Sequence, residues 1–272
     1  MVDNLIIAEG LEEALRQKTR NSAFLAGGTE INRLGSTVQA RKLISIGRIG
    51  ELDGISDADN AVKIGAMCTF QDIIDSPLVP DYLKEACSFM GSRTKRNMAT
   101  IGGNIALRRT DSYLYATLIA CGAKLELLGK DGETETRCVC CYLHHHDNFK
   151  DMLIKSVTVP KDALVFSKRY SNTVQSHAVL TVAIGKAQCK DRVLRLAVAA
   201  KDTALTRLDD IADELEKRDL SDAEILKMIE QNKELDFKAD IFGALKASMP
   251  FCVTIWLRSL RGQMLHRTVR QR

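Results

Sequence analysis

Leu25-Ala26-Gly27-Gly28-Thr29-Glu30-Ile31 and Thr100-Ile101-Gly102-Gly103-Asn104-Ile105 share one layout, an apolar run, two glycines and then a side chain with a hydroxyl or an amide. This pattern is typical of a strand that opens into a tight turn. Glycine permits positive φ and has no Cβ to keep a ligand away, so consecutive backbone amides can converge on an anion. We therefore expect the amides of residues 26–30 and 101–104 to bind one large phosphate-bearing cofactor, helped by nearby hydroxyl and amide side chains.

Neither glycine pair belongs to a familiar nucleotide-binding motif. The sequence lacks the GxGxxG spacing of a dinucleotide-binding turn, and it lacks the GxxxxGK followed by Ser or Thr of a phosphate loop. A single Gly-Gly is also typical of an ordinary tight turn, so one pair alone indicates little. Two pairs with the same layout favour cofactor binding.

The composition is that of a soluble globular protein, because 45% of the 272 residues are apolar and 27% are charged. This length favours two domains. The formal net charge of +4 is spread along the chain and gives no support to nucleic-acid binding. No apolar stretch approaches the roughly 20 residues of a membrane span. Acidic residues occupy the N-terminal region where a signal peptide would be basic, so we expect a cytoplasmic protein without a membrane span.

The eight cysteines are irregularly spaced, and in a chain without an export signal we expect most of them to be buried thiols. One short segment is rich in both Cys and His, which are side chains that zinc and iron bind. Its spacing matches neither the paired ligands of a zinc knuckle nor the separated thiolates of an iron-sulfur cluster. We therefore expect a polar connecting loop and no metal site. The segment contains Cys138, Cys140, Cys141, His144, His145, His146 and Asp147.

The secondary-structure pattern changes near residue 163. Before that point short apolar strands alternate with amphipathic helices, and after it three strand candidates precede helical sequence, in which Pro250 should bend or end the last helix. We therefore predict an α+β fold with two domains, residues 1–162 and 163–272. The first domain would divide into subdomains at about 1–55 and 56–162. The three later strands are expected over 165–170, 177–187 and 193–200, as an antiparallel meander.

Both glycine segments, with Arg96-Asn97-Met98-Ala99 ahead of the second and Gly122-Ala123-Lys124-Leu125 downstream, resemble the FAD-binding subunit of molybdenum hydroxylases. That family includes xanthine dehydrogenase and the medium subunit of aerobic carbon monoxide dehydrogenase. The resemblance covers nearly the whole chain. It implies a bipartite FAD-binding domain of the vanillyl-alcohol-oxidase or PCMH type, followed by a small α+β domain with a three-stranded antiparallel sheet and helices.

The resemblance also implies which residues contact the FAD. Both glycine turns would lie on the diphosphate, and a lysine on the first strand of the C-terminal domain would lie near the flavin. An apolar residue just ahead of the Val-Pro strand end would contact the ring, and no side chain need act as acid or base. The candidate cofactor-binding residues are Leu25, Ala26, Gly27, Gly28, Thr29, Glu30, Ile31, Thr100, Ile101, Gly102, Gly103, Asn104, Asp111, Ile154 and Lys168.

The segment after Asn104 departs from the family pattern. Many members carry an Asp nine residues past this Asn, whereas this chain has Tyr113 there. Asp111 is the nearest carboxylate, so either Asp111 takes the place of that aspartate or this chain contacts the flavin differently. Arg108 and Arg109 could balance the cofactor phosphates, meet a nicotinamide nucleotide or a partner subunit, or form a solvated basic loop.

Electron transfer is the function that the resemblance implies. The chain would be the flavoprotein subunit of an oxidoreductase, assembled with a molybdenum-cofactor subunit and a 2Fe-2S subunit as a heterotrimer or a dimer of one. It would pass electrons from those clusters to FAD and on to NAD or another acceptor. Two alternatives remain open, a free-standing flavin oxidase of the vanillyl-alcohol type and a scaffold subunit without a redox role.

Overall fold

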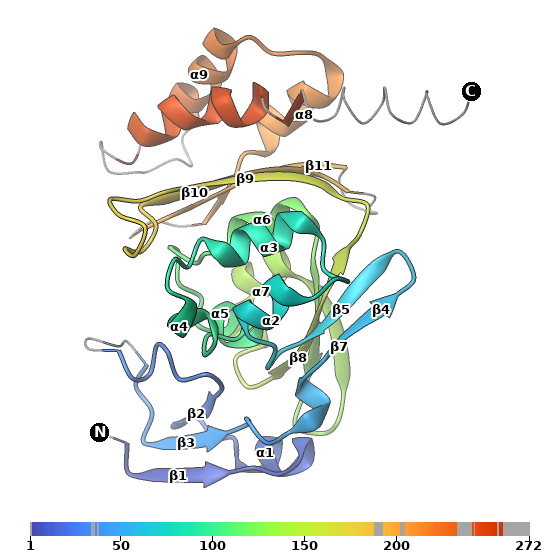
Figure 1. Ribbon diagram of the computed structural model, residues 1–272, viewed down its shortest axis with the longest axis vertical. Helices are drawn as coiled ribbons and strands as arrows, with labels where there is room; N and C mark the ends of the chain where they lie inside the picture. Colours follow the sequence, from blue (N-terminus) through green and yellow to red (C-terminus); the bar gives the residue numbers. More distant parts are fainter. Residues whose placement is uncertain are drawn as a thin grey trace. The chain divides into compact units, whose positions relative to one another are not determined.

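Two compact units make up the chain in the computed structural model, and Figure 1 shows their elements. Unit 1 comprises Met1–Arg109 and Ala123–Lys161, and unit 2 comprises Thr110–Gly122 and Asp162–Arg272. The segment 110–122, which the sequence pattern assigns to the first domain, therefore packs with the second unit. The residues described are 2–33, 36, 38–187, 193–201, 205–232, 241, 243–254, 256 and 257.

A small parallel sheet begins unit 1 and carries the first glycine segment. β1 (Asn4–Ile7) and β2 (Ser22–Leu25) each pair in parallel with the central strand β3 (Lys42–Ser45). The helix α1 (Leu11–Gln17) connects β1 to β2 and buries its apolar face in a cluster that includes Ile44. Because β2 ends at Leu25, its carboxyl end leads directly into Ala26-Gly27-Gly28.

The second sheet of unit 1 is antiparallel, with five strands in the order β4-β5-β8-β6-β7. The central strand β8 is buried along most of its length. A 3-10 helix, η1 (Gly50–Leu52), precedes β4, and α7 (Val139–His144) followed by η2 (His146–Asn148) lies between β7 and β8. The strands are β4 (Ile55–Ala58), β5 (Ala61–Gly65), β8 (Leu153–Pro160), β6 (Lys124–Leu128) and β7 (Thr134–Cys138).

Short helices connect β5 to β6, and one of them overturns an expectation for the second glycine segment. We predict a strand that opens into a turn there, but residues 101–106 form the helix α5 (Ile101–Ala106), capped by the hydroxyl of Thr100. Ahead of α5, Thr100 makes an isolated antiparallel bridge with Thr69, which itself caps α2. The helices before α5 are α2 (Phe70–Asp75), α3 (Asp81–Ser88) and α4 (Arg93–Arg96).

Thr69→Ala should lower the free energy of unfolding by about 1 kcal/mol, because Thr69 and Asp72 form a capping box. The Asp72 amide donates to Thr69 Oγ1 at 3.1 Å, and the Thr69 amide donates to the Asp72 carboxylate at 2.8 Å. Urea denaturation followed by circular dichroism measures the change. Thr136→Ala, at an exposed position of β7, is the control. An equal loss in both variants would contradict a role for the cap.

Unit 2 is built on an antiparallel sheet with helices on both faces. β9 to β11 correspond to the three expected strands, and the two-residue β12 adds a fourth at the edge, where the pattern predicts three strands. The helix α6 (Tyr115–Ala120) packs on one face, whereas α8 (Asp209–Lys217) and α9 (Asp222–Gln231) lie on the other (Figure 1). The strands are β9 (Leu164–Tyr170), β10 (Leu180–Lys186), β11 (Leu194–Ala200) and β12 (Thr206–Arg207).

Residues 243–254 are helical and run through Pro250, where we expect a bend or an end. Apolar side chains from this segment, Met249 and Val253 among them, are buried with those of β10 and β11. None of the helices in the described part of the chain is both long and apolar enough to cross a membrane.

Candidate functional site

The two glycine segments meet in unit 1, as their shared layout suggests. A Cβ atom on Gly27 would lie 1.5 Å from the carbonyl oxygen of Met98 and 3.4 Å from Cγ2 of Thr100. Ala26 also packs against the second segment, because a Cβ added to Gly103 would lie 3.6 Å from the Cβ of Ala26. The first turn therefore packs directly against the backbone that leads into α5, and only glycine fits at position 27.

The first turn presents unpaired backbone amides. Gly28 adopts a φ of 70°, and beyond it the chain makes one helix-like turn, in which the Asn32 amide donates to the Gly28 carbonyl at 3.0 Å. Within the described residues the amides of Gly27, Gly28, Thr29 and Glu30 donate no hydrogen bond to the protein. Amides without a partner at the start of such a turn can bind the oxygens of a phosphate.

The second turn does not present its amides, which corrects our expectation of backbone donors at residues 101–104. The Ile101 amide donates to the Cys68 carbonyl at 3.0 Å, and the Gly102 amide donates to the Ala66 carbonyl at 2.9 Å. The next two amides bond to Thr100, one to its hydroxyl and one to its carbonyl. The loop between β5 and α2 thus holds the second glycine segment by its backbone, and this segment in turn supports the first.

A buried carboxylate with two arginines fixes the far side of the first turn. Glu30 is only 7% exposed, and its Oε1 accepts hydrogen bonds from Arg33 at 2.7 Å and from Arg109 at 3.1 Å. Burial acts to raise the pKa of Glu30, but the hydrogen bonds and charges of Arg33 and Arg109 outweigh it and hold the pKa below its ordinary value of 4.5. The carboxylate therefore stays ionised and ties the loop after α5 to the first turn.

The remaining candidate residues lie in both units. Ile154 is buried in β8 opposite Leu127 of β6, so it is part of the core of unit 1. In unit 2, Asp111 is 4% exposed, and its Oδ2 lies 3.8 Å from Nδ1 of His177. Lys168 of β9 lies with its Nζ 4.4 Å from the centre of the Phe251 ring. Roles for these three residues at a flavin stay predictions.

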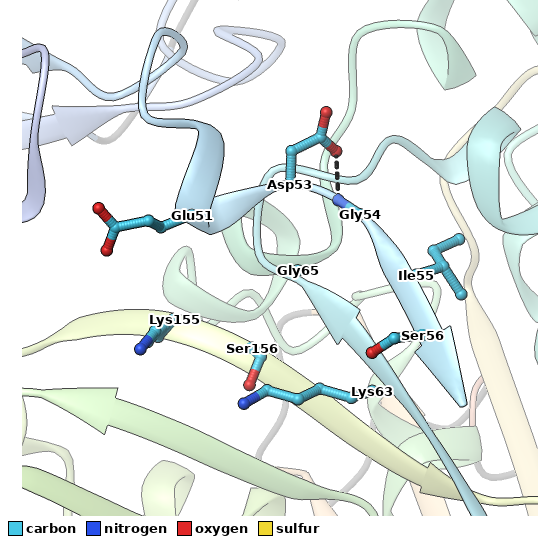
Figure 2. Close-up of a pocket in the computed structure, with 9 residues that line it drawn as sticks. All are labelled: Glu51, Asp53, Gly54, Ile55, Ser56, Lys63, Gly65, Lys155 and Ser156. Atoms are coloured by element: carbon cyan, nitrogen blue, oxygen red, sulfur yellow. Dashed lines mark hydrogen bonds between the residues drawn. The ribbon is translucent and has the colours of Figure 1, made fainter. Parts of the chain in front are cut away.

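Unit 1 also contains a polar pocket that shares no residue with the glycine segments. Its cavity is about 220 Å³, and Figure 2 shows Lys63, Lys155 and Ser156 on one side of it, across from the hydrogen-bonded pair Asp53 and Gly54. Both lysines face the carboxylate of Glu126, Lys63 at 2.6 Å and Lys155 at 3.7 Å. The lining carries two lysines and two carboxylates, Glu51 and Asp53, so its formal charges balance. Its lining comprises Glu51, Asp53, Gly54, Ile55, Ser56, Lys63, Gly65, Lys155 and Ser156.

The Cys- and His-rich segment forms the end of β7 and the helix α7. Cys138 and Cys141 are joined by a disulfide, and the Sγ of Cys140, between them in the sequence, lies 3.3 Å from Nδ1 of His144. Across the described part of the chain, no group of three or more His, Cys, Asp or Glu side chains could hold a metal ion. Cys189 falls outside the described residues.

Two residues of the glycine site, Arg33 and Met98, are not among the candidates that the sequence predicts. Arg33 lies three positions after Glu30, a spacing at which side chains meet on a helical turn, so the pair could be found from its local pattern. Met98 contacts Gly27 through its backbone carbonyl oxygen. A pattern of side chains cannot predict which backbone atom packs against a glycine. Arg109 is recognised in the sequence only as one of two adjacent cations, and its partner Glu30 is distant along the chain.

Comparison with known proteins gives one family. A family model described as "FAD binding domain in molybdopterin dehydrogenase" matches residues 3–162. The Escherichia coli protein YgfM is 35% identical over 137 residues, which are 49% of this chain and 52% of that protein. The carbon monoxide dehydrogenase medium chain of Hydrogenophaga pseudoflava is 36% identical over 123 residues, 43% of each protein. These matches span about half the length of the curated relatives.

A solved structure extends the likeness to both units of the chain. Carbon monoxide dehydrogenase from Hydrogenophaga pseudoflava superimposes with a TM-score of 0.77 over 92% of this chain and 95% of that chain. The sequence identity in that superposition is 22%, so this likeness shows the shared α+β fold alone.

Proposed function

The chain belongs to the family of FAD-binding domains of molybdopterin dehydrogenases, and from this premise we propose that it is the FAD-binding, electron-transfer subunit of a molybdenum-containing hydroxylase or dehydrogenase. FAD is its cofactor. The bound FAD supplies the redox chemistry, and the protein supplies binding, orientation and the electrostatic surroundings of the ring. We further propose that unit 1 is a bipartite domain of the vanillyl-alcohol-oxidase or PCMH type.

The unpaired amides of the first glycine turn are the observation that carries this proposal. Four successive residues, Gly27 to Glu30, have amides with no acceptor in the described part of the protein, and this is the donor set that a diphosphate requires. The residues present therefore fit the cofactor. Thr29, Thr100 and Asn104 would add side-chain donors, while Arg33 and Arg109 supply positive charge beside the turn.

Within this proposal the second glycine segment positions the first. Its amides donate to carbonyls of the loop between β5 and α2 and to Thr100, so they hold the turn at Gly27 against Met98 rather than contacting the diphosphate. Ile154, Asp111 and Lys168 would contact the ring side of the cofactor, with Asp111 in the place of the family aspartate. No side chain is assigned a proton-transfer role.

The partners that we propose are a molybdenum-cofactor subunit and a 2Fe-2S subunit. The name of the Hydrogenophaga pseudoflava relative, a medium chain of carbon monoxide dehydrogenase, supports such an assembly. Electrons would pass from the 2Fe-2S clusters to FAD and then to NAD or another acceptor. Oxidation of a small alcohol by this chain alone, with oxygen as acceptor, would favour a free-standing oxidase instead.

Purified chain should bind one FAD per molecule and should bind FMN at least about 100-fold more weakly, which corresponds to about 2.7 kcal/mol. FMN carries a single phosphate and lacks the diphosphate that the unpaired amides of the first turn would bind. Titration of cofactor-free protein, followed by quenching of flavin fluorescence, measures both affinities. Protein that does not bind FAD would overturn the proposal. Equal affinities for FAD and FMN would show that the first turn does not bind the diphosphate.

A further inference from the structure

The cysteines described in the structure differ in burial and in bonding. Four are buried thiols, and burial raises the pKa of the Cys68 thiol to about 12 and that of Cys252 to about 11. Because the thiolate is the reactive form, thiols of this kind are inert near neutral pH. Cys138 and Cys141 differ, since they form a disulfide in which Cys141 is exposed and Cys138 is half-buried.

We propose that Cys138 and Cys141 form a thiol–disulfide exchange site that takes small-molecule thiols and disulfides. The two cysteines bracket the start of α7, with Cys138 just before its first residue and Cys141 in its first turn. Cys141 is exposed, so a small reagent can approach it from solvent. Cys140 lies between them in the sequence, is half-buried and is outside the disulfide, so the chain itself provides a matched comparison.

Exchange begins when the thiolate of a small thiol attacks the sulfur of Cys141. A bond forms between that sulfur and the reagent, the Cys138–Cys141 bond breaks, and the electron pair stays on Cys138. The Cys141 amide lies 3.0 Å from the Cys138 sulfur and donates to it, which stabilises the leaving thiolate until it takes a proton. A second small thiol then releases Cys141. Two small thiols have become one small disulfide, the protein disulfide has become two thiols, and a small disulfide runs the same steps backward.

The exchange site is also connected to the first glycine turn, and this step rests on the proposed FAD-binding function of that turn. Arg108 donates a hydrogen bond to the Leu143 carbonyl of α7 at 3.2 Å, and its neighbour Arg109 pairs with Glu30. Arg108 has a φ of 51°, which costs energy in a residue other than glycine and must be held by its contacts. Opening the disulfide frees the start of α7, so the contact at Leu143 weakens and Arg109 loses support.

Equilibration of the full chain in buffers of varied glutathione and glutathione disulfide tests the exchange site. Free thiols are alkylated and mapped by mass spectrometry. We expect Cys138 and Cys141 to gain and lose alkylation together and reversibly as the buffer ratio changes, and Cys140→Ser to keep this behaviour. Cys141→Ser should abolish it. A pair that stays oxidised or reduced over the whole range, or a transition lost in Cys140→Ser, would overturn the proposal.

Calorimetric titration with FAD tests the connection to the glycine turn. The reduced wild type should bind FAD roughly fivefold more weakly than the oxidised form, at the low end of usual coupling between sites. The Cys138→Ser, Cys141→Ser double variant should bind FAD with one affinity in both buffers. Equal affinities of the two wild-type forms would overturn the connection. Absence of FAD binding in every form would instead overturn the proposed function, while the thiol mapping still decides the exchange site.

Discussion

Gly27→Ala should abolish FAD binding and lower the free energy of unfolding by about 3 kcal/mol. The added Cβ would lie 1.5 Å from the carbonyl oxygen of Met98, far inside any van der Waals contact. That oxygen belongs to the backbone leading into α5, so it cannot rotate away as a side chain would. The two glycine segments must separate to admit a methyl group, and the amides of the first turn then lose their arrangement.

Two measurements separate the loss of cofactor from the loss of fold in Gly27→Ala. Flavin absorbance after reconstitution reports the FAD content, and circular dichroism during urea denaturation reports the free energy of unfolding. Gly10→Ala is the matched control, because Gly10 has a φ of −150° and no atom within 4 Å of an added Cβ. A Gly27→Ala protein that retains FAD within twofold of the wild-type affinity would contradict the role of this contact.

Local sequence signals were sufficient for the first turn and for α2. β2 ends at Leu25, one residue before the two glycines, and the turn expected at Gly27-Gly28 is where the structure has it. Likewise Thr69 and Asp72 satisfy the exposed amides at the start of α2, and the helix begins at the next residue, Phe70. In both cases the residues that determine the backbone conformation lie within four positions of one another.

Long-range contacts account for what local signals missed. At the start of the helix α5, the amides of Ile101 and Gly102 donate to the carbonyls of Cys68 and Ala66. Residues near positions 101 and 102 in the sequence do not predict these distant partners. The ion pair between Glu30 and Arg109 joins residues 79 positions apart. The helix through Pro250 is also a tertiary effect, since burial of side chains on either side of the proline offsets its missing hydrogen bond.

Glu30→Gln should lower the free energy of unfolding at pH 7 by about 2 kcal/mol. The change removes the counter-charge of two arginines, and hydrogen bonds to charged groups contribute about 1.5–3 kcal/mol each. The Glu30 side chain is 8% exposed, but those of Arg33 and Arg109 are 36% and 25% exposed. Solvent therefore screens part of the loss, and the expected change stays well below that for a fully buried pair.

The same carboxylate predicts how stability depends on pH. Because Arg33 and Arg109 hold the pKa of Glu30 below its ordinary value of 4.5 in the folded protein, the unfolded chain takes up a proton first as the pH falls. The stability from Glu30 is thus fully present above pH 4.5 and is lost as the pH drops through the lower, folded pKa. The difference between wild type and Glu30→Gln should therefore shrink below pH 4.5.

Urea denaturation of both proteins between pH 7 and pH 3.5 measures this difference directly. Glu51→Gln is the matched control, because Glu51 is an exposed carboxylate of unit 1 for which the structure shows no ion pair among the described residues. It should differ from wild type by less than about 0.5 kcal/mol at every pH. If Glu30→Gln behaved like Glu51→Gln, or if its deficit persisted undiminished at pH 3.5, the arginines would not be holding an ionised Glu30. The first turn would then owe its position to the packing of Gly27 against Met98 alone.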